Sequence, residues 1–230
     1  MTKLLRTDRA VREFRDRDPM TPRELAERVA RDIPPGSYVN LGIGQPTRVS
    51  DYLPADSGIV LHTENGMLGM GPQAHGTMVD SDLVNAGKVP VTELPGASYF
   101  HQADSFAMMR GGHLDYCVLG AYQVSCTGDL ANWHTNRDGA IPAVGGAMDL
   151  AVGARSVYVM MSLFDKSGNS KLVEECTYPL TGRGCVHRIY SDHAVIDLGP
   201  EGAVLLETYG TTAEQLACRL PVAVVTPDEG

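Results

Sequence analysis

The chain has 230 residues, of which 43% are hydrophobic and 20% are charged, as is typical of a globular protein that buries one substantial core. The formal net charge of −9 argues against a nucleic-acid partner, because binding to phosphates favours a basic surface. No apolar stretch approaches the roughly 18 residues that a membrane span requires, so no membrane role is expected.

Residues 1–20 are expected to form a charged N-terminal extension, in which arginines alternate with acidic residues. The stretch has no apolar segment of the kind found in secretory signals, and it is richer in acids than organellar transit peptides. We predict an exposed, helical extension, followed by a single domain over residues 21–226.

The cysteines are five in number, and no two have the C-x-x-C spacing. An odd number without such a pair favours free thiols in a reducing compartment, and hence a cytoplasmic protein, over a disulfide framework or a zinc ribbon. They are Cys117, Cys126, Cys176, Cys185 and Cys218.

The domain is predicted to open with a helix. Thr21 can cap it, Pro22 suits its first turn, and Glu24 can return a hydrogen bond to the cap. A Pro-Pro-Gly sequence ends it. Residues 38–41 then predict a strand, and a glycine turn at residues 42–47 leads into a second helix, which together form the first half of a β-α-β unit.

Gly42 and Gly44 invite comparison with dinucleotide-binding turns. The match is weak, because the third glycine of that fingerprint is missing and no acid clearly follows the next strand. A tight strand-to-helix turn explains both glycines equally well. Backbone amides at the start of the helix could still hold an anion.

The next strand is predicted at residues 59–61, and a single acidic residue, Glu64, follows it. Asn65-Gly66 is a strong turn signal, since both residue types tolerate a positive φ. Glu64 is therefore presented at a strand end with little side-chain bulk around it. Taken alone, it is most simply a solvated turn residue.

The rest of the chain alternates strands with short helices. We expect a long loop after residue 72, through residues 80 and 82, then a short strand at 89–92 and a turn at 95–98. Helices are expected at 103–110 and after residues 146 and 211, and strands at 117–121, 157–161, 171–173, 194–198, 204–207 and 222–225. This order predicts an α/β fold with an open, mostly parallel sheet flanked by helices.

Ligands of open α/β sheets bind at the carboxyl ends of the strands. We therefore expect the glycine turns at residues 42–44, 64–66 and 145–146 to converge on one crevice. This expectation weakens the interpretation of Glu64 as a solvated surface residue.

The sequence gives little support for other kinds of catalytic or metal site. The seven histidines form no H-E-x-x-H or H-x-H pattern, so no metal site is predicted. There is no G-x-S-x-G sequence and no P-loop. Cys185 and His187 could form a nucleophile pair, but sharing one face of a strand explains their spacing better.

A glutamate nucleophile needs fewer supporting residues than the catalytic sets above. The ordinary glutamate pKa of roughly 4.3 leaves the side chain ionised near neutral pH without a general base. It does require an activated acyl donor, a dry pocket and oxyanion donors, which backbone amides in glycine turns can supply.

Residues 63–72 closely resemble the Ser-Glu-Asn-Gly signature of class I CoA-transferases, specifically of their B (β) subunit. The resemblance extends over about residues 21–225. Further motifs match in the family's order at residues 40–44, 85–88, 95–98, 109–113, 128–133, 145–150 and 179–182. Each motif is weak alone, but their number and order make the match specific.

Within the family, residues 132–135, 141–146 and 175–180 resemble the β-ketoadipate branch. The Met-Ile-Pro-Gly-Lys run that is usual in the acetoacetate branch is absent. Two positions depart from the family pattern: Thr63 replaces the usual Ser, and Gln45 stands where an apolar residue is usual.

The resemblance implies roles for several residues. Glu64 would attack an acyl-CoA thioester and then carry CoA as a glutamyl thioester, while Asn65 and Gly66 shape the turn that aims it. Gly146 matches the position whose backbone N–H contributes to the oxyanion hole. CoA and substrate would be bordered by Gly42, Gly44, Gly145 and Lys88, of which Lys88 matches a family lysine near CoA.

The resemblance also implies the reacting partners. CoA would be a substrate, and no resident cofactor is expected. The branch uses succinyl-CoA as donor and 3-oxoadipate as acceptor, so a basic residue should face the distal carboxylate. The candidates are His134, Arg137 and Arg183, with His134 and Arg137 favoured. A partner chain, the family's A (α) subunit, would complete the site in an A2B2 heterotetramer.

Three alternatives remain open from the sequence. The chain could serve an acetoacetate:succinyl-CoA transferase of the same mechanism. It could be a catalytically silent ligand-binding member of the fold, although such a protein would be expected to lose the glutamate or the glycine pair. An acyl-CoA hydrolase would need a water-activating arrangement that the sequence does not offer.

Overall fold

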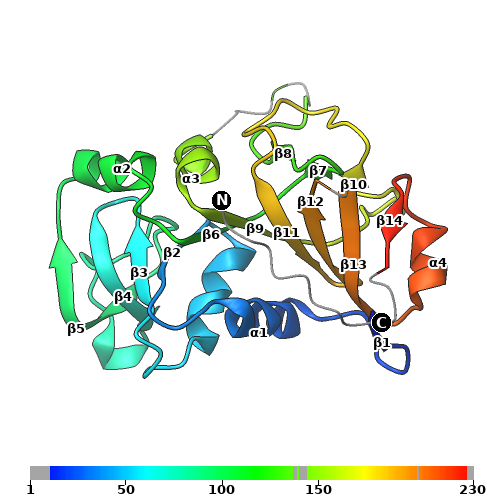
Figure 1. Cartoon of the computed structure of the whole chain (residues 1–230). Helices are drawn as coiled ribbons and strands as arrows, with labels where there is room; N and C mark the ends of the chain where they lie inside the picture. The colour runs from blue at the N-terminus through cyan, green and yellow to red at the C-terminus, as the bar shows by residue number, and fades with distance from the viewer. Residues whose placement is uncertain (1–10, 137–138, 140–143, 201, 227–230) are drawn as a thin grey trace.

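A computed structural model describes residues 11–136, 139, 144–200 and 202–226. In these residues a central sheet of 11 strands runs in the order β1-β13-β12-β11-β9-β6-β2-β3-β4-β5, with β14 beside β13 (Figure 1). Its strands are β1 (Arg12–Phe14), β2 (Tyr38–Leu41), β3 (Val60–Thr63), β4 (Met67–Gln73), β5 (Val91–Tyr99), β6 (Tyr116–Leu119), β9 (Ser156–Met161), β11 (Val186–Ser191), β12 (Ala194–Gly199), β13 (Gly202–Tyr209) and β14 (Val224–Val225).

The remaining elements are a small second sheet and the helices. The small sheet has the order β10-β7-β8. Its strands are β7 (Gln123–Ser125), β8 (Leu130–Ala131) and β10 (Leu172–Val173). The helices are α1 (Pro22–Asp32), α2 (Gln102–Arg110), α3 (Ala147–Gly153) and α4 (Ala213–Ala217), with 3-10 turns η1 (Gln45–Tyr52) and η2 (Gly76–Met78).

The five central strands, β11-β9-β6-β2-β3, pair in parallel. Antiparallel strands extend this core on both sides: β4 and β5 beyond β3, and β12 and β13 beyond β11. The predicted α/β class with an open, mostly parallel sheet is confirmed. The topological switch point of the sheet lies beside β2. From β2 the chain passes to β3 on one side, and it later returns to form β6 on the other side.

Helices cover both faces of the sheet, with α1 on one face and α2 and α3 on the other (Figure 1). The alternation of side chains along the strands explains this arrangement. On β6, Cys117 and Leu119 join the core under α2 and α3, whereas Val118 joins the core under α1. Because both faces are buried, β6 and β9 carry nearly continuous apolar runs.

Helix α1 begins as predicted. The Thr21 side chain accepts a hydrogen bond from the Glu24 N–H, and the Glu24 carboxylate accepts one from the Thr21 N–H, which forms a complete capping box. The segment after Gly42 and Gly44, predicted as a helix, is the 3-10 helix η1.

The predicted turn at residues 95–98 is wrong, because these residues lie inside β5. Strand β4, at residues 67–73, was not predicted. Its glycines allow the backbones of β4 and β5 to approach closely. A Cβ on Gly69 would lie 3.0 Å from the Ala97 Cα, and one on Gly71 would lie 2.4 Å from the Thr92 Oγ1.

The helical expectation for the N-terminal extension is wrong at residues 12–14, which form β1 parallel to β13. Phe14 stacks on Tyr209 with ring centroids 4.9 Å apart. The Ala213 N–H, at the start of α4, donates a 2.7 Å hydrogen bond to Glu13. These contacts bind the charged segment to the edge of the sheet.

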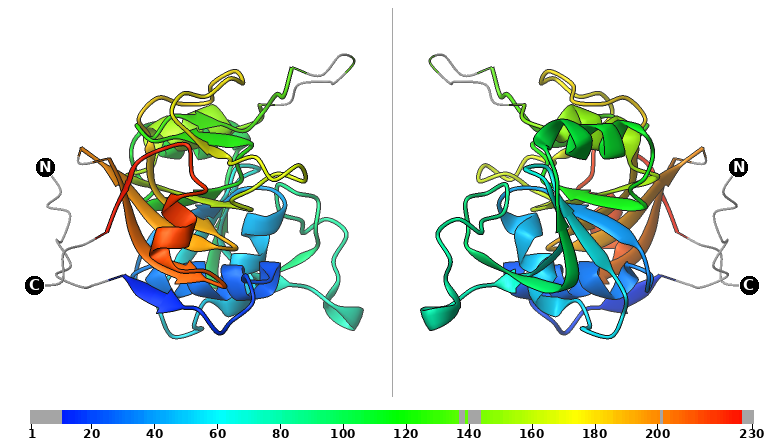
Figure 2. Two further views of the ribbon diagram at one scale, coloured as in Figure 1. Left: turned by 90° about the vertical axis from the view of Figure 1, so that its right-hand side faces the viewer. Right: turned by 90° about the vertical axis from the view of Figure 1, so that its left-hand side faces the viewer.

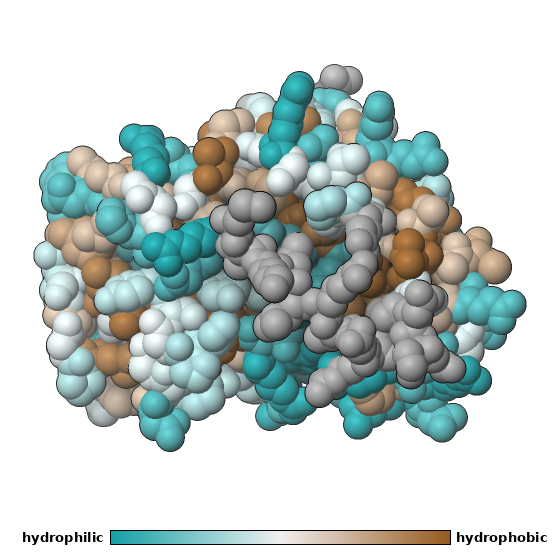
Figure 3. Space-filling model, in the orientation of Figure 1, coloured by the Kyte–Doolittle hydropathy of each residue, from teal (hydrophilic) through white to brown (hydrophobic). Residues whose placement is uncertain are grey.

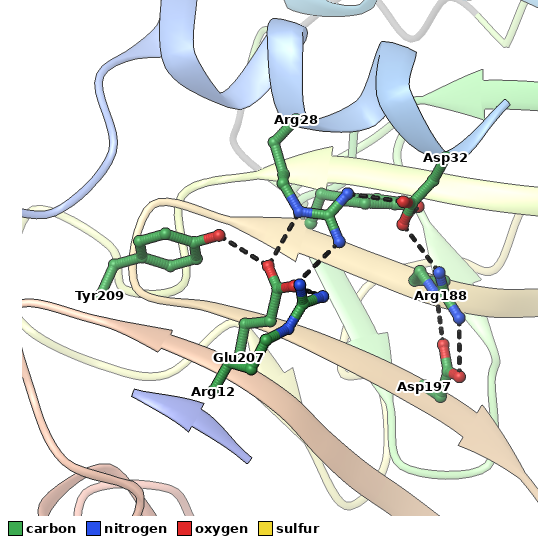
Figure 4. Close-up of polar contacts among 8 residues, drawn as sticks. Arg12, Arg28, Asp32, Arg188, Asp197, Glu207 and Tyr209 are labelled. Carbon is green, nitrogen blue, oxygen red and sulfur yellow. Dashed lines mark hydrogen bonds and ion pairs between the residues drawn. The ribbon is translucent and has the colours of Figure 1, made fainter. Parts of the chain in front are cut away.

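Glu207 lies at the centre of this attachment, with a side chain that is only 2% exposed. Arg28 on α1 donates to it at 2.8 and 3.1 Å, and Tyr209 at 2.6 Å. Arg12 on β1 completes the set (Figure 4). Burial alone would raise the pKa of Glu207, but the hydrogen bonds from Arg28 and Tyr209 lower it below its ordinary value.

The same network continues to β11 and β12 through Asp32 (Figure 4). Asp32 pairs with Arg28 at 2.7 Å and with Arg188 at 2.8 Å, and it accepts a 2.8 Å hydrogen bond from Tyr190. Arg188 in turn pairs with Asp197. The network therefore fastens α1 and β1 to the β11–β13 side of the sheet by paired, hydrogen-bonded charges.

On the face drawn in Figure 3, hydrophobic residues of the described part lie in small patches among hydrophilic ones. Among the described residues, no helix combines the length and hydrophobicity that a membrane crossing requires.

Candidate active site

A pocket of about 470 Å³ opens at the carboxyl ends of β2, β3, β6 and β9. Gly42 follows β2 and residues 120–122 follow β6, so the pocket lies where the connection reverses, the usual ligand position in open α/β sheets. Glu64, Gly145 and Gly146 also line it. The structure thus brings together residues from all three glycine turns of the sequence.

Glu64 lies directly after β3 in a tight turn. The Gly66 N–H donates to the Thr63 carbonyl at 3.1 Å, and the Phe100 N–H donates to the Gly66 carbonyl at 3.0 Å. Gly66 has φ of 111°, and a Cβ there would lie 2.1 Å from the Phe100 carbonyl oxygen. Only glycine fits this position, on conformational and steric grounds.

Asn65 is exposed and does not line the pocket. Its side-chain amide donates a 2.9 Å hydrogen bond to the Val84 carbonyl. This bond ties the Glu64 turn to the segment that leads to residues 85–87, which form another part of the pocket wall.

Helix α3 places Gly146 against the Glu64 carboxylate. The helix lies beside α2, joined to it by the Arg110–Asp149 ion pair at 2.6 Å (Figure 2). A Cβ on Gly153 would lie 2.0 Å from the Met109 carbonyl oxygen, so the two helices are in close contact. At the other end of α3, a Cβ on Gly146 would lie only 2.2 Å from Glu64 Oε2.

The surroundings of Glu64 act on its pKa in opposite directions. Burial is the largest effect and raises the pKa, whereas a hydrogen bond from the Gly146 backbone N–H lowers it and the nearby Asp149 raises it. The net result is a pKa above the ordinary value. The carboxylate is thus partly desolvated, which strengthens it as a nucleophile.

A buried polar network supports the strand end below Glu64. His62, Asn40 and Ser105 are 2%, 3% and 0% exposed. The Asn40 side-chain amide lies 3.0 Å from His62 Nδ1 and donates to the His62 carbonyl at 3.1 Å. Ser105 Oγ lies 2.9 Å from His62 Nε2 and donates to the Thr63 carbonyl at 3.0 Å.

These partners settle the tautomer of His62. Ser105 uses its only hydrogen on Thr63, so it must accept from a protonated Nε2, and Asn40 can only donate to a bare Nδ1. Burial lowers the pKa of His62 to about 4. The ring is therefore neutral near pH 7 and joins β2, β3 and α2 without placing a charge beside Glu64.

The other residues predicted for binding lie at varying distances from the pocket. Gly42 lines it, and Gly44, with φ of 93°, precedes η1 outside the lining. Lys88 is exposed with φ of 62°, next to residues 85–87 of the wall but not among the lining residues. Gln45, the departure from the family pattern, lines the pocket.

The three candidates for a distal carboxylate are not brought into the pocket. His134 Nδ1 is engaged with Asn136 at 3.1 Å, and the described residues around it run outward from the body (Figure 2). Arg183 is exposed, and neither it nor His134 belongs to the lining. Arg137 lies outside the described residues, as do residues 141–143 of the branch motif.

The Cys185–His187 pair is not arranged as a nucleophile and base. His187 Nδ1 accepts a 3.1 Å hydrogen bond from the Val157 N–H. Burial raises the pKa of Cys185 to about 11, whereas a reactive cysteine needs a lowered one. In the described part of the chain, no group of three or more histidine, cysteine or acidic side chains is placed to hold a metal ion.

Sequence reasoning missed two features of the site. The first is the His62 network, whose members come from three separate segments. The second is Lys171, which precedes β10 and lines the pocket. No local motif marks it, since only the folding of residues 163–173 against the sheet brings it there.

Comparison with known proteins gives consistent results. The family model described as "Coenzyme A transferase" matches residues 23–211. The B subunit of 3-oxoadipate CoA-transferase from Pseudomonas putida is 63% identical over 184 residues, which cover 80% of this chain and 86% of that protein. The protein of the same name from Acinetobacter baylyi is 56% identical, covering 86% and 91%. The B subunit of succinyl-CoA:3-ketoacid coenzyme A transferase from Helicobacter pylori is 47% identical, covering 80% and 87%.

Solved structures support the fold at low sequence identity. The acyl-CoA transferase YdiF of Escherichia coli O157:H7 aligns with a TM-score of 0.68 at 18% identity, covering 90% of this chain but 42% of the YdiF chain. Glutaconate coenzyme A-transferase of Acidaminococcus fermentans aligns with a TM-score of 0.62 at 16% identity, covering 93% and 92%.

Proposed function

Because this chain belongs to the coenzyme A transferase family, we propose that it is the nucleophile-bearing subunit of a 3-oxoadipate CoA-transferase. In this proposal CoA passes from succinyl-CoA to 3-oxoadipate through a thioester on Glu64. The observation that carries the proposal is the position of Glu64, at the end of β3, in a pocket, with the backbone of Gly146 against its carboxylate.

The chemistry keeps the acyl group activated at every step. The Glu64 carboxylate attacks the succinyl-CoA carbonyl and expels CoA thiolate, which leaves a succinyl-glutamyl anhydride. The thiolate then attacks the Glu64 carbonyl of the anhydride, forming the glutamyl-CoA thioester and releasing succinate. The carboxylate of 3-oxoadipate attacks that thioester, and the returning thiolate takes the 3-oxoadipyl group from Glu64.

The Gly146 N–H suits the steps in which the carbonyl carbon of Glu64 is itself attacked. In those steps negative charge develops on a Glu64 oxygen, and the Gly146 backbone adjoins Glu64 Oε2, where an added Cβ would lie 2.2 Å away. A fixed backbone donor of this kind stabilises a tetrahedral intermediate without reorganisation. The raised pKa of Glu64 fits the same picture, since a desolvated site also slows hydrolysis of the intermediates.

The pocket is open to solvent at its rim. Ile43 and Tyr122 line the pocket yet are 64% and 44% exposed, so water reaches its rim in this chain alone. The related proteins are named as B subunits, which supports an α-subunit partner that covers this rim. We propose an A2B2 assembly, with CoA as a substrate and no resident cofactor.

The preference for 3-oxoadipate rests on the order of similarity. The two relatives named for 3-oxoadipate are 63% and 56% identical, whereas the relative named for 3-ketoacids is 47% identical. An acetoacetate:succinyl-CoA transferase is the second candidate, supported by that 47% match.

The five cysteines are free thiols, and we place the enzyme in the reducing cytoplasm on that ground.

The test uses the complex with the α subunit. On incubation with succinyl-CoA, mass spectrometry should find CoA attached to Glu64, and borohydride should trap the thioester by reduction. Glu64→Ala should abolish both signals and keep the complex assembled. Steady-state rates with 3-oxoadipate and acetoacetate then decide between the two acceptors. Absence of any adduct on Glu64 in an assembled complex would refute the proposal.

A further inference from the structure

Lys171 is the only lysine or arginine among the described residues that line the pocket. We propose that its ammonium binds the distal carboxylate of a dicarboxylic acyl group, at the end opposite to the carbon that reacts with Glu64. The inference rests on the proposed transferase function, because it assigns a subsite within that active site.

The strand order places Lys171 at a useful distance from Glu64. Glu64 follows β3, and the sheet continues through β2 and β6 to β9. The Lys171 N–H donates at 2.8 Å to the carbonyl of Leu163, just after β9. At roughly 4.8 Å between strands, three steps separate the two backbones by on the order of 14 Å. Both side chains line the pocket that occupies this interval.

A short diacid fits between two such side chains. Carbon–carbon bonds of about 1.5 Å give succinate a span of roughly 4 Å between its carboxyl carbons, and 3-oxoadipate roughly 6 Å. The reach of the glutamate and lysine side chains takes up the remainder. The flexible stem of lysine can adapt to both diacids, which one active site must accept in turn.

The backbone of Lys171 is held firmly on both sides. Besides its bond to Leu163, its carbonyl accepts a 2.9 Å hydrogen bond from the Val124 N–H, next to the chain that follows β6. Leu172 is fully buried. The ammonium is therefore carried on a fixed base at the pocket wall, which is what a binding subsite requires.

The charge of Lys171 is left largely uncompensated. Within the described residues, no carboxylate oxygen lies within 4.0 Å of its ammonium. Burial lowers the pKa of Lys171, and the more distant Asp192 and Asp165 offset only part of that effect. A half-buried cation without a close counter-ion gains more from an incoming carboxylate than an exposed lysine would.

The proposal separates substrates by their distal ends. Succinyl and 3-oxoadipyl groups carry a carboxylate there, whereas an acetoacetyl group ends in a methyl group. Lys171 should therefore favour binding of the diacids and leave the acetoacetyl group unaffected. It does not act on the reacting carbonyl, so the covalent chemistry at Glu64 continues without it.

The experiment measures how fast the complex with the α subunit forms the Glu64–CoA adduct, over a range of acyl-CoA concentrations. The donors are succinyl-CoA, its methyl half-ester, which lacks the distal charge, and acetoacetyl-CoA. The enzyme variants are K171M and K171R, with K166M as a matched control, since Lys166 is exposed and lies outside the pocket lining.

K171M should raise the half-saturating concentration of succinyl-CoA about 10- to 100-fold, the loss expected for one charge-assisted hydrogen bond. It should leave the values for the half-ester and acetoacetyl-CoA nearly unchanged. The wild type should discriminate against the half-ester by a similar factor, and K171M should not. K171R should show a smaller loss with succinyl-CoA only, and K166M should match the wild type.

Two results would overturn the proposal. An equal loss with all three donors would show that Lys171 supports the fold or the CoA moiety, and no loss with succinyl-CoA would show that the ammonium is not used. If K171M does not assemble, the same conclusions follow from K171R, which keeps the charge but moves it. If the wild type forms no adduct with any donor, the transferase proposal itself fails, which is a separate outcome.

Discussion

Gly146→Ala should separate catalysis from folding more cleanly than any other substitution in the site. Gly146 has φ of −84° and ψ of 5°, which alanine adopts without strain. Its new Cβ would nevertheless lie 2.2 Å from Glu64 Oε2, where carbon and oxygen atoms normally stay more than about 3 Å apart. Since the nearest backbone is not in the way, the Glu64 carboxylate must move by about 1 Å.

That displacement should be costly for the reaction and cheap for the fold. A misplacement of about 1 Å costs on the order of 100-fold in rate, and loss of one oxyanion donor costs about 100- to 1,000-fold. We therefore expect the rate of adduct formation to fall by roughly 100- to 1,000-fold. The thermal midpoint should change by no more than about 4 °C, because a flexible side chain absorbs the clash.

The assay is single-turnover formation of the Glu64–CoA thioester by the assembled complex, combined with thermal unfolding of the same sample. Val152→Ala is the matched control, since Val152 lies on α3 but is 79% exposed. Wild-type kinetics in Gly146→Ala would refute the inferred contact between Gly146 and the nucleophile. A loss of rate together with a collapse of the fold would refute the steric argument.

Three further predictions concern protonation, support and stability. Because burial raises the pKa of Glu64 and only the carboxylate attacks, kcat/KM should fall as pH drops through a pKa above the ordinary value of about 4.3; a pH profile flat down to that value would contradict this. His62→Gln keeps one acceptor for Asn40 and one donor for Ser105, so it should retain most activity. His62→Leu leaves both buried groups unpaired, so it should lower the free energy of unfolding by about 1–3 kcal/mol and slow adduct formation. Equal behaviour of the two variants would count against the network. Arg28→Met removes one arginine from each of Glu207 and Asp32, which keep Arg12 and Arg188 as partners. It should lower the free energy of unfolding by about 1–3 kcal/mol, against less than about 1 kcal/mol for the exposed Arg31→Met. Since the pKa values of Glu207 and Asp32 are lowered in the fold, this stabilisation is present above the unfolded pKa of about 4. It is lost as pH falls through the folded values, so wild-type and Arg28→Met stabilities should converge in acid; a gap that stays constant would refute the assignment.

Local interactions made part of the structure predictable. The capping box of Thr21 and Glu24 spans four residues, so the sequence alone identifies the start of α1. The turn that presents Glu64 is likewise built from adjacent residues. Both predictions depend on chemistry within one or two turns of the chain, and the structure agrees with both.

Long-range contacts explain what the sequence did not reveal. Gly69 and Gly71 gave no indication of a strand, but they allow β4 to pack closely against β5, and no local rule distinguishes a glycine inside a strand from one in a turn. The N-terminal charges suggested a solvated helix because Glu207, the partner of Arg12, lies 195 residues away. Lys171 and the His62 network became visible only once several segments met at the pocket.

The attachment of β1 also sets an order of events during synthesis. Its only partner in the described sheet is β13, so Arg12–Phe14 cannot pair until residues 202–209 have left the ribosome. Strand β1 is therefore synthesised long before its partner strand and must dock late. Its arginines stay solvated until Glu207 is available for pairing. Because this segment is highly charged, it has little tendency to associate with a partly folded core, which suits its late docking.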